Sequence, residues 1–229
     1  MKNLSFKSIL VVLLTISSFN LFSQAFEKGN WNIDLDLGGA AYGSRTTLTL
    51  AVAGFNFTTS EEDGAVSTIF RLGGEYGISN RIGLGLKIGS SNYLIAKEDR
   101  DTVKSVTETD FAIHVNFHLL KAERNDLFLT LGLGISNAKW QYHDVSGFLL
   151  SSASGSGSYF TLGITDRIFF SDHIGVLFNL SYAGFNYRGV TPELSSTGKA
   201  ITAVVPSYSL KLDFELKGVY FGTGLAVKF

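Results

Sequence analysis

Residues 127–136 read Leu-Phe-Leu-Thr-Leu-Gly-Leu-Gly-Ile-Ser. Large apolar side chains stand at every second position from Leu127 to Ile135, and from Thr130 onward the positions between them hold only Thr, Gly or Ser. Because successive side chains of a β-strand point to opposite faces, this alternation predicts a strand with one bulky apolar face and one face of small residues.

Seven other segments show the same period of two. They are residues 31–38, 66–78, 82–89, 110–119, 159–168, 174–182 and 219–229. Together these segments predict about eight strands of ~11 residues each. At ~3.3 Å per residue and a tilt of ~45°, such a strand climbs ~25 Å, which is the height of the apolar band of a transmembrane β-barrel.

The small-residue face decides between a soluble β-sandwich and a transmembrane barrel. In a sandwich the large apolar face turns inward and the opposite face must coat the molecule. Here the opposite face is rich in Gly, Ser and Thr, as in Gly83, Gly85 and Gly89. Small residues around a narrow lumen, with bulky apolar residues facing lipid, are the inverted arrangement that a transmembrane barrel needs.

The connections between the segments have two lengths. Short polar connections lie at residues 79–81, 122–126 and 171–173, and long ones at 42–65, 96–108, 143–157 and 188–205. Transmembrane barrels have short turns at one end and long loops at the other. The sequence therefore predicts an all-β fold, a transmembrane antiparallel up-and-down β-barrel of eight strands. A ten-stranded barrel that recruits residues 46–57 is the alternative.

The last part of the chain breaks the simple pattern. Large apolar residues stand at even positions over residues 210–216 and at odd positions over 219–229. A hairpin at Lys217 and Gly218 would explain the change but would make nine strands. We instead predict a β-bulge at Gly218, which shifts the parity within one strand and keeps both termini on the periplasmic side.

The composition excludes several classes of protein. Of 229 residues, 45% are hydrophobic and only 17% are charged, which is unlike a disordered chain. The net charge of −1 gives no sign of the excess positive charge that binds nucleic acid. The absence of cysteine excludes disulfide scaffolds, thiolate metal sites and cysteine nucleophiles.

The N-terminus has the three parts of a secretory signal peptide. Lys2 and Lys7 give a positive start, residues 9–14 form a short apolar run, and Ser23-Gln24-Ala25 gives a cleavage zone of small residues. We expect residues 1–24 to be the signal peptide, with cleavage within 23–26, and residues 25–229 to form the barrel domain.

Three features carry a resemblance to a known family: the signal peptide, the segment YGISNRIGLGL at 76–86, and the ending GVYFGTGLAVKF at 218–229. The chain resembles the small OmpA/OmpX-like outer-membrane β-barrel proteins of Gram-negative bacteria. The resemblance implies location in the outer membrane, contact with its lipid, and assembly by the barrel-assembly machinery and periplasmic chaperones. It also implies an assembly signal at Gly224, Val227 and Phe229. Gly222 differs from the usual ending of this family, in which that position is polar.

Charged residues on the small-residue face predict whether the lumen is open or filled. We predict a lumen charge network of Asp34, Asp36, Arg71, Glu75, Lys87, Asp110 and Arg167, and the same parity also places Lys211, Asp213, Glu215, Lys217 and Lys228 inside. The signs balance, and eight strands leave room only for side chains, so these groups should pair and plug the lumen. We expect Arg71 and Glu75 to pair with adjacent strands, for example with Lys87 or Asp110.

No motif points to catalysis or to a cofactor. His114 and His118 share a face, but ~13 Å separates strand positions four residues apart, so the two cannot chelate one metal directly. Ser181, His118 and Glu75 lie on different segments with no motif that unites them. We expect a monomeric, non-enzymatic barrel with a structural, surface-interaction or small-solute role. A membrane-embedded lipid-modifying enzyme and a secreted lipocalin-like binder are the alternatives.

Overall fold

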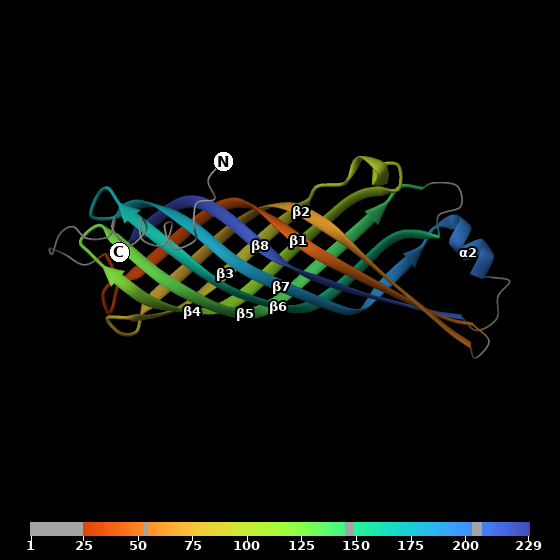
Figure 1. Ribbon diagram of the computed structural model, residues 1–229, viewed down its shortest axis with the longest axis horizontal. Coiled ribbons are helices and arrows are strands. Elements are labelled where there is room, and N and C mark those ends of the chain that lie inside the picture. Colours follow the sequence, from red (N-terminus) through yellow and green to blue (C-terminus); the bar gives the residue numbers. More distant parts are fainter. Residues whose placement is uncertain (1–24, 53–54, 145–148, 203–207) are drawn as a thin grey trace, which may run out of the picture.

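The computed structural model describes residues 25–52, 55–144, 149–202 and 208–229. Eight antiparallel strands follow one another around a closed barrel, and β1 pairs with β8 to close it (Figure 1). The strands are β1 (Trp31–Val52), β2 (Phe55–Gly77), β3 (Ile82–Tyr93), β4 (Val103–Lys121), β5 (Asn125–Tyr142), β6 (Leu150–Phe169), β7 (Ile174–Leu194) and β8 (Tyr208–Lys228). This architecture confirms the predicted eight-stranded, up-and-down barrel.

Two short helical segments accompany the strands. They are the 3₁₀ helix η1 (Lys97–Asp99) and the α-helix α2 (Ser196–Thr202). Both lie at the end of the barrel opposite to the C-terminus (Figure 1). Within the described residues, no helix is both long and apolar enough to cross a membrane.

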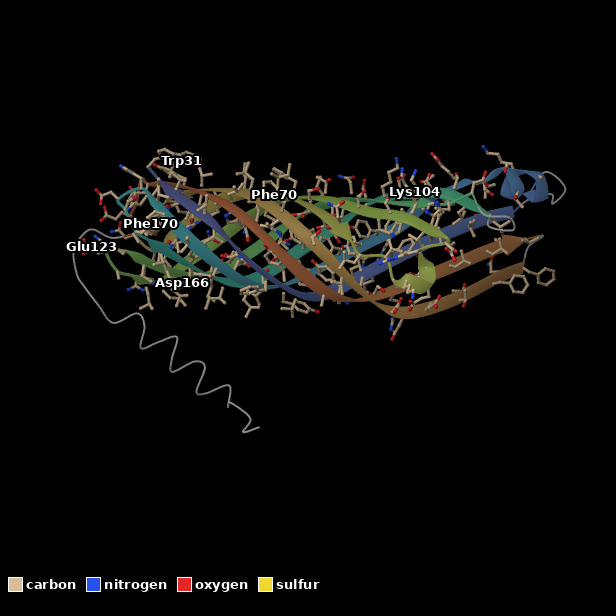
Figure 2. All side chains as sticks on the ribbon, turned by 90° about the horizontal axis from the view of Figure 1, so that it is seen from above. Trp31, Phe70, Lys104, Glu123, Asp166 and Phe170 are labelled. Carbon is tan, nitrogen blue, oxygen red and sulfur yellow. The ribbon has the colours of Figure 1, made fainter. Side chains whose placement is uncertain are left out.

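The barrel is apolar outside and polar inside over most of its length. Leu131 and Leu133 of β5 are 57% and 65% exposed, whereas Thr130 and Ser136, on the opposite face, are buried. Large exposed apolar side chains continue in this way around the barrel and form an apolar belt, which includes Phe70 (Figure 2). The inversion confirms the alternation expected of a barrel in lipid and contradicts the sandwich arrangement.

Glycines on the lumen side let neighbouring backbones approach closely. A Cβ atom at Gly134 would lie 2.0 Å from the carbonyl oxygen of Phe111 on β4. A Cβ atom at Gly224 would lie 1.8 Å from the carbonyl oxygen of Leu35 on β1. Both distances are impossible for a real side chain, so only glycine fits at these positions.

The strands run well beyond the apolar belt toward the end that carries α2. We call these parts the outer extension, which comprises residues 43–52, 55–65, 103–109, 137–142, 150–158, 185–194 and 208–218. The prediction that residues 42–65 form a loop was wrong, because β1 and β2 stay paired up to Val52 and Phe55. The ten-stranded alternative is excluded for the same reason, since residues 46–57 lengthen two strands instead of forming new ones.

The predicted bulge at Gly218 is absent. β1 and β8 pair without a register shift from Asn32 and Lys228 to Val52 and Tyr208. Even-numbered residues of β8 therefore face inward throughout, and Leu212, Leu216 and Tyr220 are buried. The predicted lumen positions of Lys211, Asp213, Glu215 and Lys217 were wrong, since these four lie on the outer face.

The apolar side chains of β8 change from the outer to the inner face because the surrounding solvent changes, not because the strand register shifts. Around the apolar belt the barrel meets lipid, whereas its outer extension meets water. Apolar side chains therefore turn inward in the outer extension, where Trp140, Tyr187 and Leu212 belong to one buried cluster. The same strand reverses its hydrophobic face near Gly218 with no change of backbone geometry.

Candidate functional site

A buried ion cluster crosses the lumen near the end where the short turns lie. Its centre is Arg167 of β6, whose guanidinium donates to both carboxylate oxygens of Asp34 at 2.9 and 2.7 Å. The same group lies 2.7 Å from a Glu75 oxygen and 3.1 Å from an Asp126 oxygen. Arg167, Glu75 and Asp126 are almost wholly inaccessible to solvent. One cation thus meets three carboxylates from three other strands.

His118 completes this cluster. Its Nδ1 lies 2.5 Å from an Asp126 oxygen and its Nε2 lies 2.9 Å from a Glu75 oxygen. The ring of Phe26 stacks on the imidazole with 3.4 Å between ring centroids, and Phe26 is itself fully buried. The five residues Asp34, Glu75, His118, Asp126 and Arg167 are called the lower lumen cluster below.

The lower lumen cluster contains part of the charge network predicted from the sequence. Asp34, Glu75 and Arg167 meet in it. The remaining four, Asp36, Arg71, Lys87 and Asp110, face the lumen elsewhere, and none of them forms a direct ion pair with another described residue.

The partners of Arg71 and Glu75 differ from the expected ones. Glu75 pairs with Arg167 and His118 instead of Lys87 or Asp110. The guanidinium carbon of Arg71 lies 4.1 Å from the ring centroid of Tyr220, on β8. In so narrow a barrel, a side chain reaches across the lumen as readily as along the sheet.

Two members of the lower lumen cluster escaped the sequence reasoning. Asp126 fell within the short connection predicted at residues 122–126, although it lies on β5 and is fully buried. The sequence pattern suggested only a metal ligand or a catalytic base as the role of His118. The available signal was its position on the small-residue face, together with the acidic residue Asp126 at the start of the next strand.

The spaces around the charged groups in the lumen are small. The cavity between Asp36, Arg71 and Lys87 holds about 10 Å³. That volume is about enough for one water molecule. Little free space therefore remains beside these three side chains.

The arrangement does not form a hydrolytic triad. His118 contacts Glu75, but its two ring nitrogens are both occupied by carboxylates. The hydroxyl of Ser181 is buried on β7 and has no hydrogen-bond partner among the described residues. Within the described ranges, no group of three His, Cys, Asp or Glu side chains is placed to hold a metal ion.

Aromatic side chains fill the lumen of the outer extension. Trp140 stacks on Phe214 with 4.3 Å between centroids, and its edge meets the ring of Tyr187. Tyr159 stacks on Phe185 at 4.8 Å, one level closer to the belt. These rings belong to or pack against the buried cluster inside the barrel, farther from the short turns than the lower lumen cluster.

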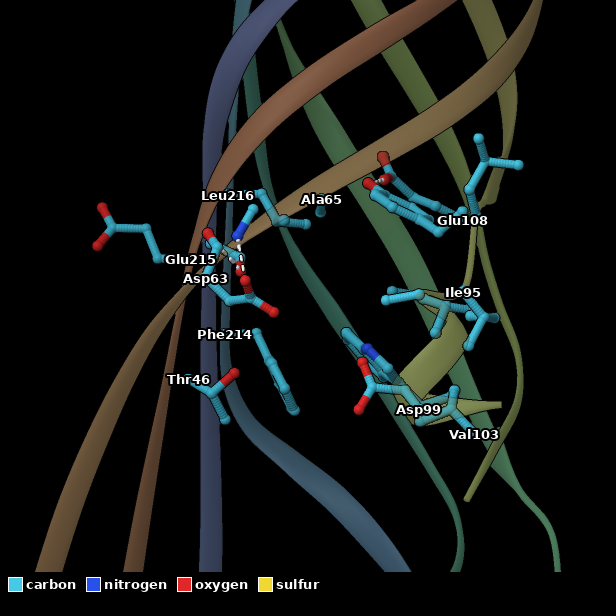
Figure 3. A pocket seen from close by; sticks show the side chains of 18 residues that line it. Thr46, Asp63, Ala65, Ile95, Asp99, Val103, Glu108, Phe214, Glu215 and Leu216 are labelled. Atoms are coloured by element: carbon cyan, nitrogen blue, oxygen red, sulfur yellow. Dashed lines mark hydrogen bonds between the residues drawn. The ribbon is translucent and has the colours of Figure 1, made fainter. Parts of the chain in front are cut away.

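A cavity of about 190 Å³ opens beside these rings, and its lining side chains are drawn in Figure 3. Glu108 of β4 lies at its inner end. The carboxylate accepts hydrogen bonds from the hydroxyls of Tyr93 and Ser136, the second at 3.0 Å. Glu108 lies outside the membrane-spanning part of β4, which begins with the exposed Phe111. Burial raises the pKa of Glu108 to about 7, although these hydrogen bonds oppose the shift.

Comparisons with known proteins support the fold. No family model and no curated protein matches the chain. The chain is similar to the solved structure of outer membrane protein OprG from Pseudomonas aeruginosa, with a TM-score of 0.56 and 12% sequence identity, over 89% of this chain and 97% of that one. The attachment invasion locus protein Ail of Yersinia pestis (TM-score 0.40, 13% identity, 88% and 99% covered) and the outer membrane protease OmpT of Escherichia coli (0.44, 13%, 91% and 99%) also match, but too weakly to support an argument.

The chain therefore has the fold of an outer-membrane β-barrel protein, and its apolar belt is that of a barrel that spans a membrane. Within that class it has eight strands in up-and-down order. The resemblance to the small OmpA/OmpX-like barrels, predicted from the sequence, is thus confirmed at the level of the fold.

Proposed function

We propose that this protein is a closed, non-enzymatic barrel of the outer membrane, which acts through its outer extension in a structural or surface-interaction role. The observation that carries the proposal is the lower lumen cluster. Its five side chains come from β1, β2, β4, β5 and β6 and meet inside the lumen, near the end that carries the short turns. A path for solutes would have to break contacts that hold buried charges in place, which is costly.

Two further features support a closed barrel. Phe26 stacks on His118 below the ion pairs, and the backbone nitrogen of Ala25 donates to the carbonyl oxygen of Ala122 at 2.9 Å. The start of the barrel domain is therefore tied to a short turn. Above the cluster, the aromatic side chains around Trp140 and Phe185 fill the lumen of the outer extension.

The predictions that concern biogenesis belong to the same proposal. Residues 1–24 lie outside the described residues, and we propose that they direct export and are removed. We further propose that the assembly machinery reads Gly224, Val227 and Phe229. Phe229 supports this role because it is two-thirds exposed while its backbone pairs with Trp31, so its ring is available at the barrel end. We propose a monomer.

Single-channel recording in planar lipid bilayers tests the closed barrel. The purified, refolded protein should show no steady conductance of porin size, whereas a porin reconstituted in the same bilayers serves as the positive control. Arg167→Ser removes the central cation and much of the side-chain volume, and should produce frequent brief openings. A steady, porin-sized conductance of the unmutated protein would refute the closed barrel.

A further inference from the structure

The cavity of about 190 Å³ lies where two strands separate. β2 and β3 pair up to Ser67 and Tyr93, and beyond that point β2 continues toward Phe55 without β3 beside it. The connection between β3 and β4, which includes η1, spans the fork. The cavity occupies the space between this connection, the outer part of β1 and β2, and the aromatic cluster inside the barrel (Figure 3).

The charges around this cavity have a single sign. Asp63, Asp99 and Glu108 line it with their carboxylates, and no Lys, Arg or His is among the lining residues. Figure 3 shows Asp99 on the cavity side, across from Phe214. Glu215 also borders the cavity, but its side chain points away in Figure 3 and pairs with Lys217.

Apart from the acidic residues, Ser44, Thr46 and Gly64, the lining is apolar or aromatic. Tyr93, Trp140 and Phe214 contribute rings, and Ile95 and Val103 contribute aliphatic side chains. Trp140 and Phe214 are stacked on each other, which fixes the wall that they form. Aromatic surfaces attract cations through their ring electrons, and aliphatic side chains favour ligands with an apolar body.

We propose that this cavity binds a small organic ammonium cation with an apolar body, held by the carboxylates of Asp63, Asp99 and Glu108 against Tyr93, Trp140 and Phe214. Each feature of the lining selects against another class of ligand. An anion would meet three carboxylates with no cation to offset them. A bare divalent ion would need several oxygens converging on one point, and the described residues offer no such group.

The position of Glu108 gives the site its inner anchor. The carboxylate is 2% exposed and is held by the hydroxyls of Tyr93 and Ser136, so its direction is fixed before a ligand arrives. Asp99 and Asp63, in contrast, lie exposed near the entrance. A cation would thus pass from exposed carboxylates to a buried one, along a wall of rings.

Tryptophan fluorescence measures this binding directly. The protein has two tryptophans, and Trp31 lies at the opposite end of the barrel, so the Trp31→Phe variant leaves Trp140 as the only reporter. Benzyltrimethylammonium is the probe, because its charge is permanent. We expect saturable quenching of Trp140, with at least tenfold weaker binding of benzyl dimethyl carbinol, which has nearly the same shape without the charge, and no binding of phenylacetate.

Matched carboxamide variants assign the charge effect to the cavity. Glu108→Gln and Asp99→Asn should each weaken binding about tenfold, as expected for the loss of one charge-assisted contact. Asp99 is exposed at the end of η1, so its replacement leaves folding intact even if the Glu108 variant folds poorly. Glu215→Gln is the control, because it removes the same charge at the same rim from a side chain that points away.

Three outcomes would overturn the proposal. They are the absence of saturable quenching, equal binding of the neutral carbinol, and an effect of Glu215→Gln as large as that of Asp99→Asn. The proposal deepens the surface role proposed above and rests on it only in placing function at the outer extension. Conductance recording tests only the closed barrel and ligand titration tests only the cavity, so either proposal can be refuted without the other.

Discussion

Arg167→Met is the most informative single change in the lumen. The substitution keeps an unbranched side chain but leaves the carboxylates of Asp34, Glu75 and Asp126 facing one another in a site shielded from solvent. Breaking a buried ion pair by removing one partner costs about 3–5 kcal/mol. Since Arg167 meets three carboxylates, we expect a loss near the upper end of that range.

The assay is equilibrium unfolding of the refolded protein in lipid vesicles by urea, followed by Trp fluorescence and by heat-modifiable migration on gels. Adding Glu75→Gln to Arg167→Met removes one of the stranded charges and should restore part of the lost free energy of unfolding. The two changes should therefore be non-additive by about 0.5–3 kcal/mol. Arg45→Gln is the matched control, because the ion pair of Arg45 with Glu62 is exposed and should contribute little.

Two results would refute this reasoning. One is a loss below ~1 kcal/mol for Arg167→Met, well under the cost of a broken buried pair. The other is simple additivity of Arg167→Met and Glu75→Gln, which would mean that the two groups do not interact in the folded barrel.

Three further predictions test the belt, the lumen and the outer cavity. Leu131→Arg, at the exposed middle of β5, should cost ~2–4 kcal/mol of unfolding free energy in the urea assay, whereas Ser154→Arg on the outer extension should be nearly neutral. Equal costs would show that the apolar belt has been assigned to the wrong part of the barrel. Gly134→Ala should lower the free energy of unfolding by ~1–3 kcal/mol because its Cβ would lie 2.0 Å from a backbone oxygen. Gly73→Ala should change it by under ~0.5 kcal/mol, because the nearest atom to its Cβ is the flexible end of Lys87 at 3.4 Å and its other neighbours are at ordinary contact distance. Binding of benzyltrimethylammonium should strengthen as the pH rises through about 7, because the raised pKa of Glu108 keeps its carboxyl neutral below that pH and ionised above it, and the rise should be absent in Glu108→Gln.

The strand pattern could be predicted because its cause is local. Alternation at Leu131 and Gly132 depends only on the extended backbone, whose side chains point to opposite faces. The same logic assigned Asp34, Glu75 and Arg167 to the inner face, and these three residues meet in the lower lumen cluster. Which inner residues meet, however, depends on how the strands tilt and shift around the barrel. Asp34 and Arg167 are 133 positions apart, and no local pattern encodes their contact.

The loops were mispredicted for a different reason. Residues 42–65 contain Glu61, Glu62 and Asp63, and a charged segment between two apolar strands resembles a solvated loop. These residues instead continue β2 in water, paired with β1 up to Phe55. β-Branched residues such as Thr46, Thr47 and Thr49 favour that extended pairing. The polarity of these residues correctly indicated that water surrounds them. It did not indicate whether their backbone forms a strand or a loop.

The same distinction explains β8, where a change in hydrophobic parity was mistaken for a change in register. Over 219–229 the odd-numbered side chains are apolar and face lipid, and over 210–216 the even-numbered ones are apolar and face the lumen. A strand that leaves lipid for water must exchange its apolar face, because lipid accepts apolar side chains on the outside of the barrel whereas water drives them inward. The parity switch at Lys217 and Gly218 therefore marks the boundary of the apolar belt on β8. Beyond that boundary the barrel is built like a soluble protein, with an aromatic interior and a charged exterior, and this is the part that carries the outer cavity.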